Sequence, residues 1–349
     1  MRGLRPMALA LATALFLAAC GGTSSSSSGG SSSCSKTYKV GLVTDVGKLT
    51  DKSFNANSWQ GVVDAQNDKS LCVAGKYIES NQPTDYQKNL QTFVDQGYDM
   101  VVGVGFLMGD AVLAAAKANP KTKFAIVDFA GDNWPGNLTG LVFKEDQAGY
   151  LAGALAGLTT KTNTIGVVGG LKIPAVERYA LGYAAGAKAE NPSVNVLTVY
   201  QGPGDGSAFN NPDWGKARAN DMIRQNADIV FGAGGNTGNG ALLGALAASK
   251  TCIGVDVDQF VSYPDVAACL LTSAEKKLAN AVKTIVTAGV QNKWPTARAL
   301  TFDASNGGVG IAPFHNFDSK VPADVRTKIT DLTSKLANGS LSTGVTVTG

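Results

Sequence analysis

Seven side chains that suit the binding of a small polar ligand follow the ends of predicted strands. They are aromatic rings, carboxylates, an amide and an ammonium: Asp45, Phe54, Asn55, Asp128, Phe209, Asp256 and Lys276. Aromatic faces can stack on a flat group, and carboxylates and amides can hydrogen-bond hydroxyl or amide groups. Ligands of open α/β sheets bind beyond the carboxyl ends of the strands. The sequence therefore predicts a polar binding site at these loops.

Each of these residues also has a structural alternative. Asp45 and Asp128 could cap helices, and Phe54 and Phe209 could belong to the core. The seven residues follow five different strands, and a sixth strand, 229–232, is followed by the polar run Gly232–Gly240. This recurrence favours a shared binding site over separate structural roles.

The sequence offers little for catalysis. Its one histidine, His315, lies in Pro313-Phe-His-Asn-Phe317, and no Gly-x-Ser-x-Gly or His-Glu-x-x-His motif occurs. The run from Gly103 to Gly109 misses the dinucleotide-binding spacing by one residue, and no phosphate-binding P-loop is present. We therefore expect no catalytic residues, no metal site, no cofactor and no enzymatic activity.

The first nineteen residues are typical of an export signal. Arg2 and Arg5 precede an apolar stretch over residues 7–19, which is too short to span a bilayer. Leu17-Ala-Ala-Cys20 then resembles a bacterial lipobox, in which Cys20 is lipidated and becomes the N-terminus. The Gly/Ser-rich residues 20–36 are expected to form a flexible linker. A plain secretory signal with an incidental cysteine is the alternative.

Composition agrees with an exported globular body. The 349 residues are 44% hydrophobic and carry a formal net charge of +3. Removal of Arg2 and Arg5 leaves 28 basic against 27 acidic residues. A nearly neutral body argues against a nucleic-acid partner, and the length suggests two domains.

Four cysteines remain after Cys20, and they allow three disulfide pairings. The order of the predicted strands favours Cys34–Cys72 and Cys252–Cys269, each joining neighbouring strands. Four buried or free thiols are the alternative, and the absence of a Cys-x-x-Cys spacing argues against a redox motif or a zinc site.

The rest of the chain alternates between strand and helix patterns, which predicts βαβ units in parallel sheets that helices cover on both faces. Strands are expected at 39–44, 76–79, 100–103, 124–128, 138–143, 165–168, 194–200, 229–232, 253–257 and 270–272. Helices are expected at 55–70, 86–96, 111–119, 147–158, 175–190, 214–225, 238–249 and 274–288. A mid-chain linker at 137–144 would give two similar doubly wound lobes. A barrel is the less favoured architecture.

Several motifs together resemble the basic membrane protein family of bacterial lipoproteins, which includes the purine nucleoside receptor lipoprotein of spirochaetes. The resemblance runs from about residue 38 to the C-terminus. It rests on the segments 45–61, 103–107, 124–128, 143–153, 168–170, 173–174, 235–240, 254–259 and 271–273. The chain departs from the family pattern at Lys48, at Lys276-Lys277 and in a longer loop at 202–206.

The resemblance implies a type I periplasmic binding protein fold. Two Rossmann-like lobes are joined by a hinge of three crossings, with 37–142 and about 256–292 in the first lobe and 143–255 and about 293–349 in the second. It also implies an ABC permease as partner, a lipid anchor on the outer side of the cell membrane and a monomeric state.

The resemblance further implies a nucleoside as ligand. Phe54 and Phe209 would stack on the base, while Asn55 and Asp128 bind its edge. Asp256 would hold the ribose hydroxyls, with Lys276 and Asp45 completing the sugar side. A sensor or adhesin that binds a sugar or another molecule, and a nucleoside-processing enzyme, are the alternatives.

Overall fold

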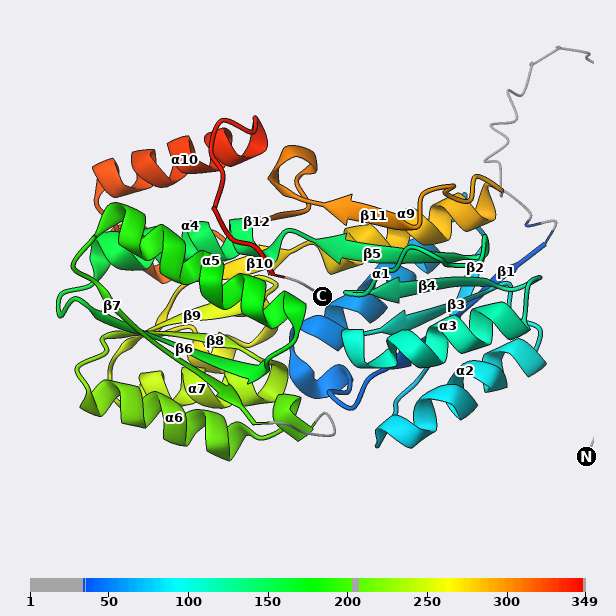
Figure 1. The fold of residues 1–349 in the computed structure, drawn as a ribbon, viewed down its shortest axis with the longest axis horizontal. Coiled ribbons are helices and arrows are strands. Elements are labelled where there is room, and N and C mark those ends of the chain that lie inside the picture. The colour runs from blue at the N-terminus through cyan, green and yellow to red at the C-terminus, as the bar shows by residue number, and fades with distance from the viewer. Residues whose placement is uncertain (1–33, 35, 203–206, 348–349) are drawn as a thin grey trace, which may run out of the picture. The chain divides into compact units, whose positions relative to one another are not determined.

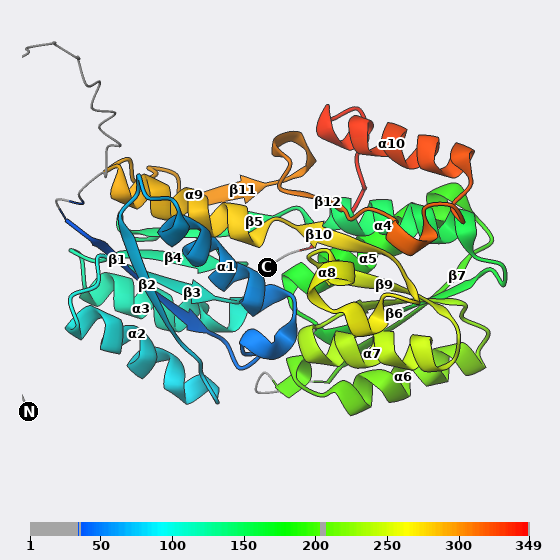
Figure 2. The ribbon, with the colours of Figure 1, turned by 180° about the vertical axis from the view of Figure 1, so that it is seen from behind.

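Two six-stranded sheets organise the part of the chain that the structure describes, residues 34, 36–202 and 207–347. The structure is a computed structural model, and Cys34–Gly349 form one compact unit. Figures 1 and 2 show each sheet at the centre of one lobe, with helices on both of its faces. This confirms the predicted fold class. The expected signal peptide 1–19, Cys20 and the linker up to residue 33 lie outside the described residues.

The first sheet, sheet A, has the order β11-β5-β4-β3-β1-β2, and all of these strand pairs are parallel. Its strands are β1 (Tyr38–Thr44), β2 (Val73–Ile78), β3 (Met100–Val104), β4 (Lys123–Val127), β5 (Leu138–Phe143) and β11 (Ala299–Phe302). Helices α1 (Phe54–Asn67) and α9 (Leu278–Val290) cover one face, and α2 (Tyr86–Asp95) and α3 (Gly109–Ala118) cover the other (Figure 1). β3 is apolar throughout, and β4 is apolar and buried after Lys123, because both faces of the sheet are covered.

The second sheet, sheet B, has the order β12-β10-β9-β8-β6-β7, with only β12 antiparallel to its neighbour among the described strand pairs. Its strands are β6 (Thr164–Leu171), β7 (Asn195–Gln201), β8 (Ile229–Ala233), β9 (Thr251–Asp256), β10 (Leu270–Lys276) and β12 (Val309–Ile311). Helices α4 (Glu145–Thr159) and α5 (Pro174–Glu190) cover one face, and α6 (Pro212–Arg224) and α7 (Gly235–Ala247) cover the other. The short α8 (Gln259–Ser262) follows β9, and α10 (Ala323–Ala337) packs on α4. None of the described helices combines the length and apolar character needed to cross a bilayer.

Within the described residues the chain passes between the lobes three times. It crosses at Lys144 between β5 and α4, at Lys277 between β10 and α9, and over 303–308 between β11 and β12. The crossings are hydrogen-bonded to one another. Lys144 N donates to the Phe302 carbonyl at 2.9 Å, and Lys277 N donates to the Gly308 carbonyl at 2.8 Å. The hinge is therefore a bundle of three adjacent segments.

The lobe boundaries differ from those predicted. Of the predicted first-lobe segment 256–292, β10 instead pairs with β9 and β12 in sheet B, while α9 packs on α1 beside sheet A as predicted. Of the predicted second-lobe segment 293–349, β11 instead pairs with β5 in sheet A, while β12 and α10 lie in the sheet B lobe as predicted. The helix predicted over 274–288 begins only at Leu278, because Ala274, Glu275 and Lys276 continue the β10 ladder.

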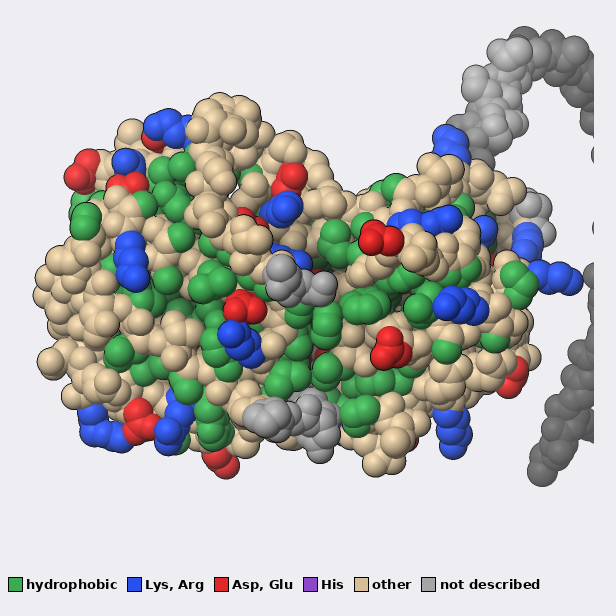
Figure 3. All heavy atoms as spheres, in the orientation of Figure 1, with side chains coloured by type: hydrophobic (Ala, Val, Ile, Leu, Met, Phe, Trp, Pro, Cys, Tyr) green, Lys and Arg blue, Asp and Glu red, His purple; other side chains and the backbone are tan. Residues whose placement is uncertain are grey.

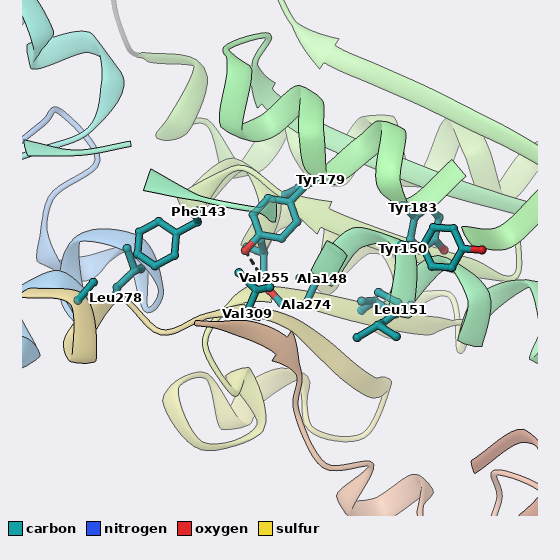
Figure 4. Packing of buried hydrophobic residues seen from close by; sticks show 14 of the residues in the cluster. Phe143, Ala148, Tyr150, Leu151, Tyr179, Tyr183, Val255, Ala274, Leu278 and Val309 are labelled. Carbon is teal, nitrogen blue, oxygen red and sulfur yellow. Dashed lines mark hydrogen bonds between the residues drawn. The ribbon is translucent and has the colours of Figure 1, made fainter. Parts of the chain in front are cut away.

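Helices α4 and α5 approach backbone to backbone through glycines. A Cβ atom at Gly153 would lie 1.9 Å from the Tyr183 carbonyl oxygen, and one at Gly186 would lie 2.0 Å from that of Tyr150. No side chain fits at either contact without moving a helix. Tyr150 and Tyr183 extend from the two helices into the core that Figure 4 shows from close by.

Gly153→Ala should therefore lower the free energy of unfolding by about 1–3 kcal/mol, the usual cost of overpacking a tight contact. Urea denaturation followed by circular dichroism measures this change. Gly136→Ala is the matched control, because a Cβ atom there meets nothing within 4 Å. Equal stability of the two variants would contradict the backbone contact.

Candidate binding site between the lobes

A cavity lies between the two lobes at the carboxyl ends of several strands. The space between atoms in the cavity and its opening, solvent included, is about 590 Å³. Its polar residues lie together because they follow parallel strands, whose carboxyl ends lie at the same edge of each sheet. All seven residues singled out in the sequence line this one cavity: Asp45, Phe54, Asn55, Asp128, Phe209, Asp256 and Lys276. The first four come from the sheet A lobe and the last three from the sheet B lobe.

On the sheet A side, two carboxylates hold the amide of Asn55. Asn55 Nδ2 donates to Asp45 Oδ1 at 2.9 Å and to Asp51 Oδ2 at 3.1 Å. Asp45 directly follows β1, and its Oδ1 also accepts from Gly47 N at 2.8 Å. Asn55 lies in the first turn of α1 and is 1% exposed. Its position is therefore fixed from two sides.

Asp51 explains why α1 begins where it does. Its carboxylate accepts from the backbone N–H groups of Ser53, Asn55 and Ala56 at 3.1, 2.7 and 3.2 Å. These are donors that the first turn of a helix leaves without a partner inside the helix. Asp51 itself is 1% exposed. One buried side chain thus starts the helix and orients the amide that faces the cavity.

On the sheet B side, the ammonium of Lys276 is buried among carboxylates. Lys276 Nζ lies 2.5 Å from Asp128 Oδ2, 3.5 Å from Glu145 Oε1 and 3.9 Å from Asp256 Oδ1. The Lys276 side chain is 2% exposed and that of Asp128 is 4% exposed. Lys276 belongs to the sheet B lobe and Asp128 to the sheet A lobe. The ion pair therefore bridges the lobes.

Three aromatic rings complete the surroundings of this ammonium. Lys276 Nζ lies 4.7 Å from the ring centre of Phe54, 5.3 Å from that of Phe143 and 5.8 Å from that of Tyr179. Aromatic faces attract cations, more strongly where water is excluded. Figure 4 shows Phe143 and Tyr179 among the buried residues, with the hydrogen bond from the Tyr179 hydroxyl to the Ala274 carbonyl.

The charged environment of Lys276 keeps it protonated. Burial alone lowers the pKa of Lys276, but the carboxylates of Asp128, Glu145 and Asp256 outweigh burial and raise it above its usual range. Glu145 also lies 3.6 Å from Arg178 Nε. The ammonium is thus a permanent charge whose partners are part of the site.

Asp128 and Asp256 occupy equivalent places in the two lobes. Asp128 directly follows β4, and Asp256 is the last residue of β9. Both have left-handed backbone conformations, with φ of 64° and 67°. Such conformations are costly for residues other than glycine and cluster at functional sites. The strained turns direct both carboxylates into the same cavity.

Phe209 reaches the cavity from a short 3-10 turn, Ser207–Phe209, after β7. Its ring lies against Gly170, where a Cβ atom would come within 2.5 Å of two ring carbons. The turn is followed by Asn211, whose side chain accepts from Trp214 N and starts α6. The ring is therefore held against the backbone of β6.

Two further hydrogen bonds cross between the lobes beside the cavity. Asn239 Nδ2 donates to the Asp51 carbonyl at 2.8 Å, and Ser262 Oγ donates to the Lys52 carbonyl at 2.7 Å. Gln259 Nε2 in turn donates to Asn239 Oδ1 at 2.8 Å. The two hydrogen bonds between the lobes can form only when the lobes are closed, so they stabilise the closed conformation.

Sequence reasoning did not assign Asp51, Glu145, Tyr179 and Asn239 to the site. Asp51, Glu145 and Asn239 lie inside the segments that carry the family resemblance, so a signal for them was present. Tyr179 has no such signal because it reaches the cavity from the middle of α5. Its place depends on how α5 packs.

The remaining chemical candidates lie elsewhere. Cys34–Cys72 and Cys252–Cys269 are disulfide-bonded. The second disulfide joins β9 to the residue directly before β10.

His315 also lies away from the cavity. Its Nε2 atom lies 2.7 Å from Asp258 Oδ2, and its ring stacks on Phe260. Among the described residues, no group of His, Cys, Asp and Glu side chains has the geometry to hold a metal ion. On the face in Figure 3, acidic and basic side chains are mixed, as expected for a nearly neutral body.

Residues 38–342 match the family described as ABC transporter substrate-binding protein PnrA-like, or Bmp. The chain belongs to the Bmp family. This is a family of solute-binding proteins of ABC transporters and not of enzymes. The expectation of a non-enzymatic binding protein is thereby confirmed.

Relatives of this Bmp protein come from several bacteria. It is 33% identical to a CD4+ T-cell-stimulating antigen of Listeria monocytogenes, over 96% of each chain. It is 32% identical to the ABC transporter nucleoside-binding protein BmpA of Lactococcus lactis, over 93% of this chain and 95% of the relative. An ABC transporter solute-binding protein from Aeropyrum pernix shares the fold, with a TM-score of 0.78 at 22% identity over 87% of this chain and 92% of that one.

The buried carboxyls of the site predict an unusual dependence of stability on pH. Burial raises the pKa of four of them, opposed in part by hydrogen bonds or nearby cations. The values are about 6 for Asp45 and Asp256 and about 7 for Asp51 and Glu145. Between about pH 4 and 7 the folded protein therefore binds protons that the unfolded chain, with ordinary carboxyls, releases.

The free energy of unfolding of the ligand-free protein should accordingly rise as the pH falls from about 7 to about 5. A gain on the order of 1 kcal/mol or more is expected, since one pKa unit corresponds to about 1.4 kcal/mol. Urea denaturation at several pH values measures it, with Asp51→Asn expected to show a smaller gain. Stability that falls or stays level over this pH range would contradict the burial of these carboxyls.

Proposed function

We propose that this Bmp-family protein captures a purine nucleoside between its lobes outside the cytoplasm and delivers it to the permease of an ABC transporter. The observation that carries the proposal is the convergence of aromatic, acceptor and ammonium groups from both lobes on one cavity. The Lactococcus lactis relative is named as a nucleoside-binding protein, which supports the same ligand class here.

The two ends of the cavity suit the two parts of a nucleoside. Phe54 comes from one lobe and Phe209 from the other, and they would stack on opposite faces of the base. Asn55 and Asp128 would bind the edge of the base. Asp256 would accept hydrogen bonds from the ribose hydroxyls, with Lys276 beside it. Asp45, which the family resemblance places on the sugar side, contacts the Asn55 amide and would hold it against the base.

Capture would proceed by closure of the hinge. In an open form the ligand contacts one lobe, and closure adds the contacts from the other. The closed form already has direct bonds between the lobes, among them Lys276 to Asp128 and Asn239 to Asp51. The permease would recognise the closed, loaded form, and the binding protein would act as a monomer.

The anchoring part of the proposal rests on the N-terminal sequence alone. Cleavage before Cys20 and lipidation of its thiol would tether the body through the Gly/Ser linker to the outer side of a membrane. Mass spectrometry of the N-terminal peptide from membranes should find Cys20 as a diacylated N-terminal residue. A peptide that retains residues 1–19, or an unmodified Cys20, would contradict the anchor.

The binding proposal is tested by calorimetry on protein that has been unfolded and refolded to remove any ligand. Inosine, guanosine and adenosine should bind with one-to-one stoichiometry, while free ribose and galactose should give no heat. Binding of sugars alone would retain the transport role but contradict stacking by Phe54 and Phe209. Absence of binding to any of these ligands would favour a sensor or adhesin.

Asp256→Ala should weaken purine nucleoside binding by about 2–4 kcal/mol while the protein stays folded, because the ribose hydroxyls lose a charged acceptor. Asp265→Ala is the matched control, since Asp265 is exposed in the same lobe and does not line the cavity. Equal affinities of the two variants in the same titration would remove Asp256 from the site.

A further inference from the structure

Basic side chains gather at the amino edge of sheet A, which lies at the opposite end of its strands from the cavity. The chain segments that meet at this edge carry eight basic but only three acidic side chains, although the whole body is nearly neutral. On the face in Figure 3, Lys and Arg side chains lie over this end of the molecule. The segments are 36–39, 66–73, 95–100, 117–123, 135–138 and 290–299.

Backbone contacts hold these segments side by side. Asp99 N donates to the Lys39 carbonyl at 3.0 Å, and Lys123 N donates to the Asp99 carbonyl at 3.1 Å. Lys123 Nζ also lies 5.4 Å from the ring centre of Trp294, in the segment that leads to β11. The basic residues therefore share one surface across the edge of the sheet.

The acidic residues at this edge leave most of the lysines without a partner. Asp99 accepts from Lys36 Nζ and from Lys39 N, both at 2.8 Å. Asp68 lies 3.3 Å from Lys283 Nζ in α9. Six further Nζ groups, here called the edge lysines, form no ion pair with a carboxylate of the described residues. They are Lys39, Lys69, Lys117, Lys121, Lys123 and Lys293.

The proposed anchor would join the body at the same edge. Cys34 is disulfide-bonded to Cys72, directly before β2, and Tyr38 N donates to the Cys72 carbonyl at 3.0 Å. The 14 residues 20–33 precede Cys34 and are rich in Gly and Ser. A coil of this length and composition spans about 20 Å on average and about 50 Å at most. A lipid on Cys20 would therefore keep the edge lysines close to the membrane surface.

We propose that the amino edge of sheet A is a membrane-facing surface whose lysines bind the anionic headgroups of phospholipids. This inference goes beyond the proposed function and rests on its lipid anchor. A negatively charged membrane attracts lysines within a Debye length, about 8–10 Å, and the linker lets them reach that distance. Because the cavity lies at the other end of the strands, this contact keeps the cavity away from the membrane.

The edge lysines also have a structural alternative. A cation near the C-terminal end of a helix interacts favourably with the helix dipole, and Lys117 lies in the last turn of α3. That role would affect the stability of the protein but not its affinity for membranes. Membrane binding therefore separates the two roles.

The first test measures co-sedimentation of the unlipidated mature chain with vesicles. The chain begins at residue 20 and carries Cys20→Ser, so that only the body can bind. Vesicles of phosphatidylglycerol and phosphatidylcholine should bind it at least about 10-fold more tightly than phosphatidylcholine alone, because lysines attract the anionic headgroups. About 1 M salt should abolish the difference, since the Debye length falls to about 3 Å. Equal binding to both kinds of vesicle, or binding to neither, would overturn the proposal.

The second test removes charge from the edge. Lys69→Gln, Lys121→Gln and Lys293→Gln together should weaken binding to the anionic vesicles at least about 10-fold, since each lysine near such a surface contributes about five-fold. All three side chains are exposed and do not line the cavity. The triple variant should therefore fold and bind nucleosides like the parent chain, which circular dichroism and calorimetry check.

The matched control removes three lysines from the other end of the molecule. Lys161→Gln, Lys250→Gln and Lys320→Gln together take the same charge from a groove at the amino edge of sheet B. Binding to the anionic vesicles should then change by less than about 2-fold, because these lysines lie beyond the reach of a screened membrane charge. An equal loss in the two triple variants would show that net charge alone drives binding, and would overturn the assignment of this surface.

The outcomes separate this inference from the proposed function. A lipidated Cys20 in the native protein, together with no preference for anionic vesicles, would overturn the surface and keep the anchor. An unmodified Cys20 would overturn the anchor and, with it, the membrane-facing role. If the edge variant does not fold, the dependence of binding on lipid and salt in the parent chain decides.

Discussion

The rest of the site depends on the ion pairs between the buried ammonium of Lys276 and the carboxylates around it. Removing an ammonium from water is costly unless charged partners surround it. Its partners come from three places: Asp128 at the end of β4, Asp256 at the end of β9 and Glu145 beside the first hinge crossing. The burial of one side chain therefore ties together the two sheets and the hinge. It also requires the lobes to meet at this point.

The same interaction shapes the chemistry of the cavity. More carboxylates than cations are buried here, and the carboxyls of Asp45, Asp51 and Asp256 have raised pKa values as a result of burial. Oxygen acceptors that protein donors do not satisfy must be satisfied by the ligand. A neutral ligand rich in hydroxyl and N–H donors fits this requirement better than an anion. The geometry of the cavity thus favours the class of solute proposed above.

The sequence predicted the architecture and the cluster of site residues because both depend on local patterns. Apolar runs locate buried strands, and polar residues directly after them mark the edge where ligands bind.

The predictions of secondary structure from the sequence were wrong where a long-range strand pairing overrides the local pattern. Residues 274–276 look helical but extend β10, because β9 and β12 pair with them. β11 and β12 are too short to stand out, and α10 was overlooked although Val325, Ile329, Leu332 and Leu336 have helical spacing. The role of Asp51 follows only from hydrogen-bond geometry.

A crystal structure of the protein with guanosine would show directly whether both lobes hold the nucleoside. We expect the base between the rings of Phe54 and Phe209, its edge at Asn55 and Asp128, and the ribose hydroxyls at Asp256. A base that lies outside the two rings, or a ribose that points away from Asp256, would contradict this arrangement.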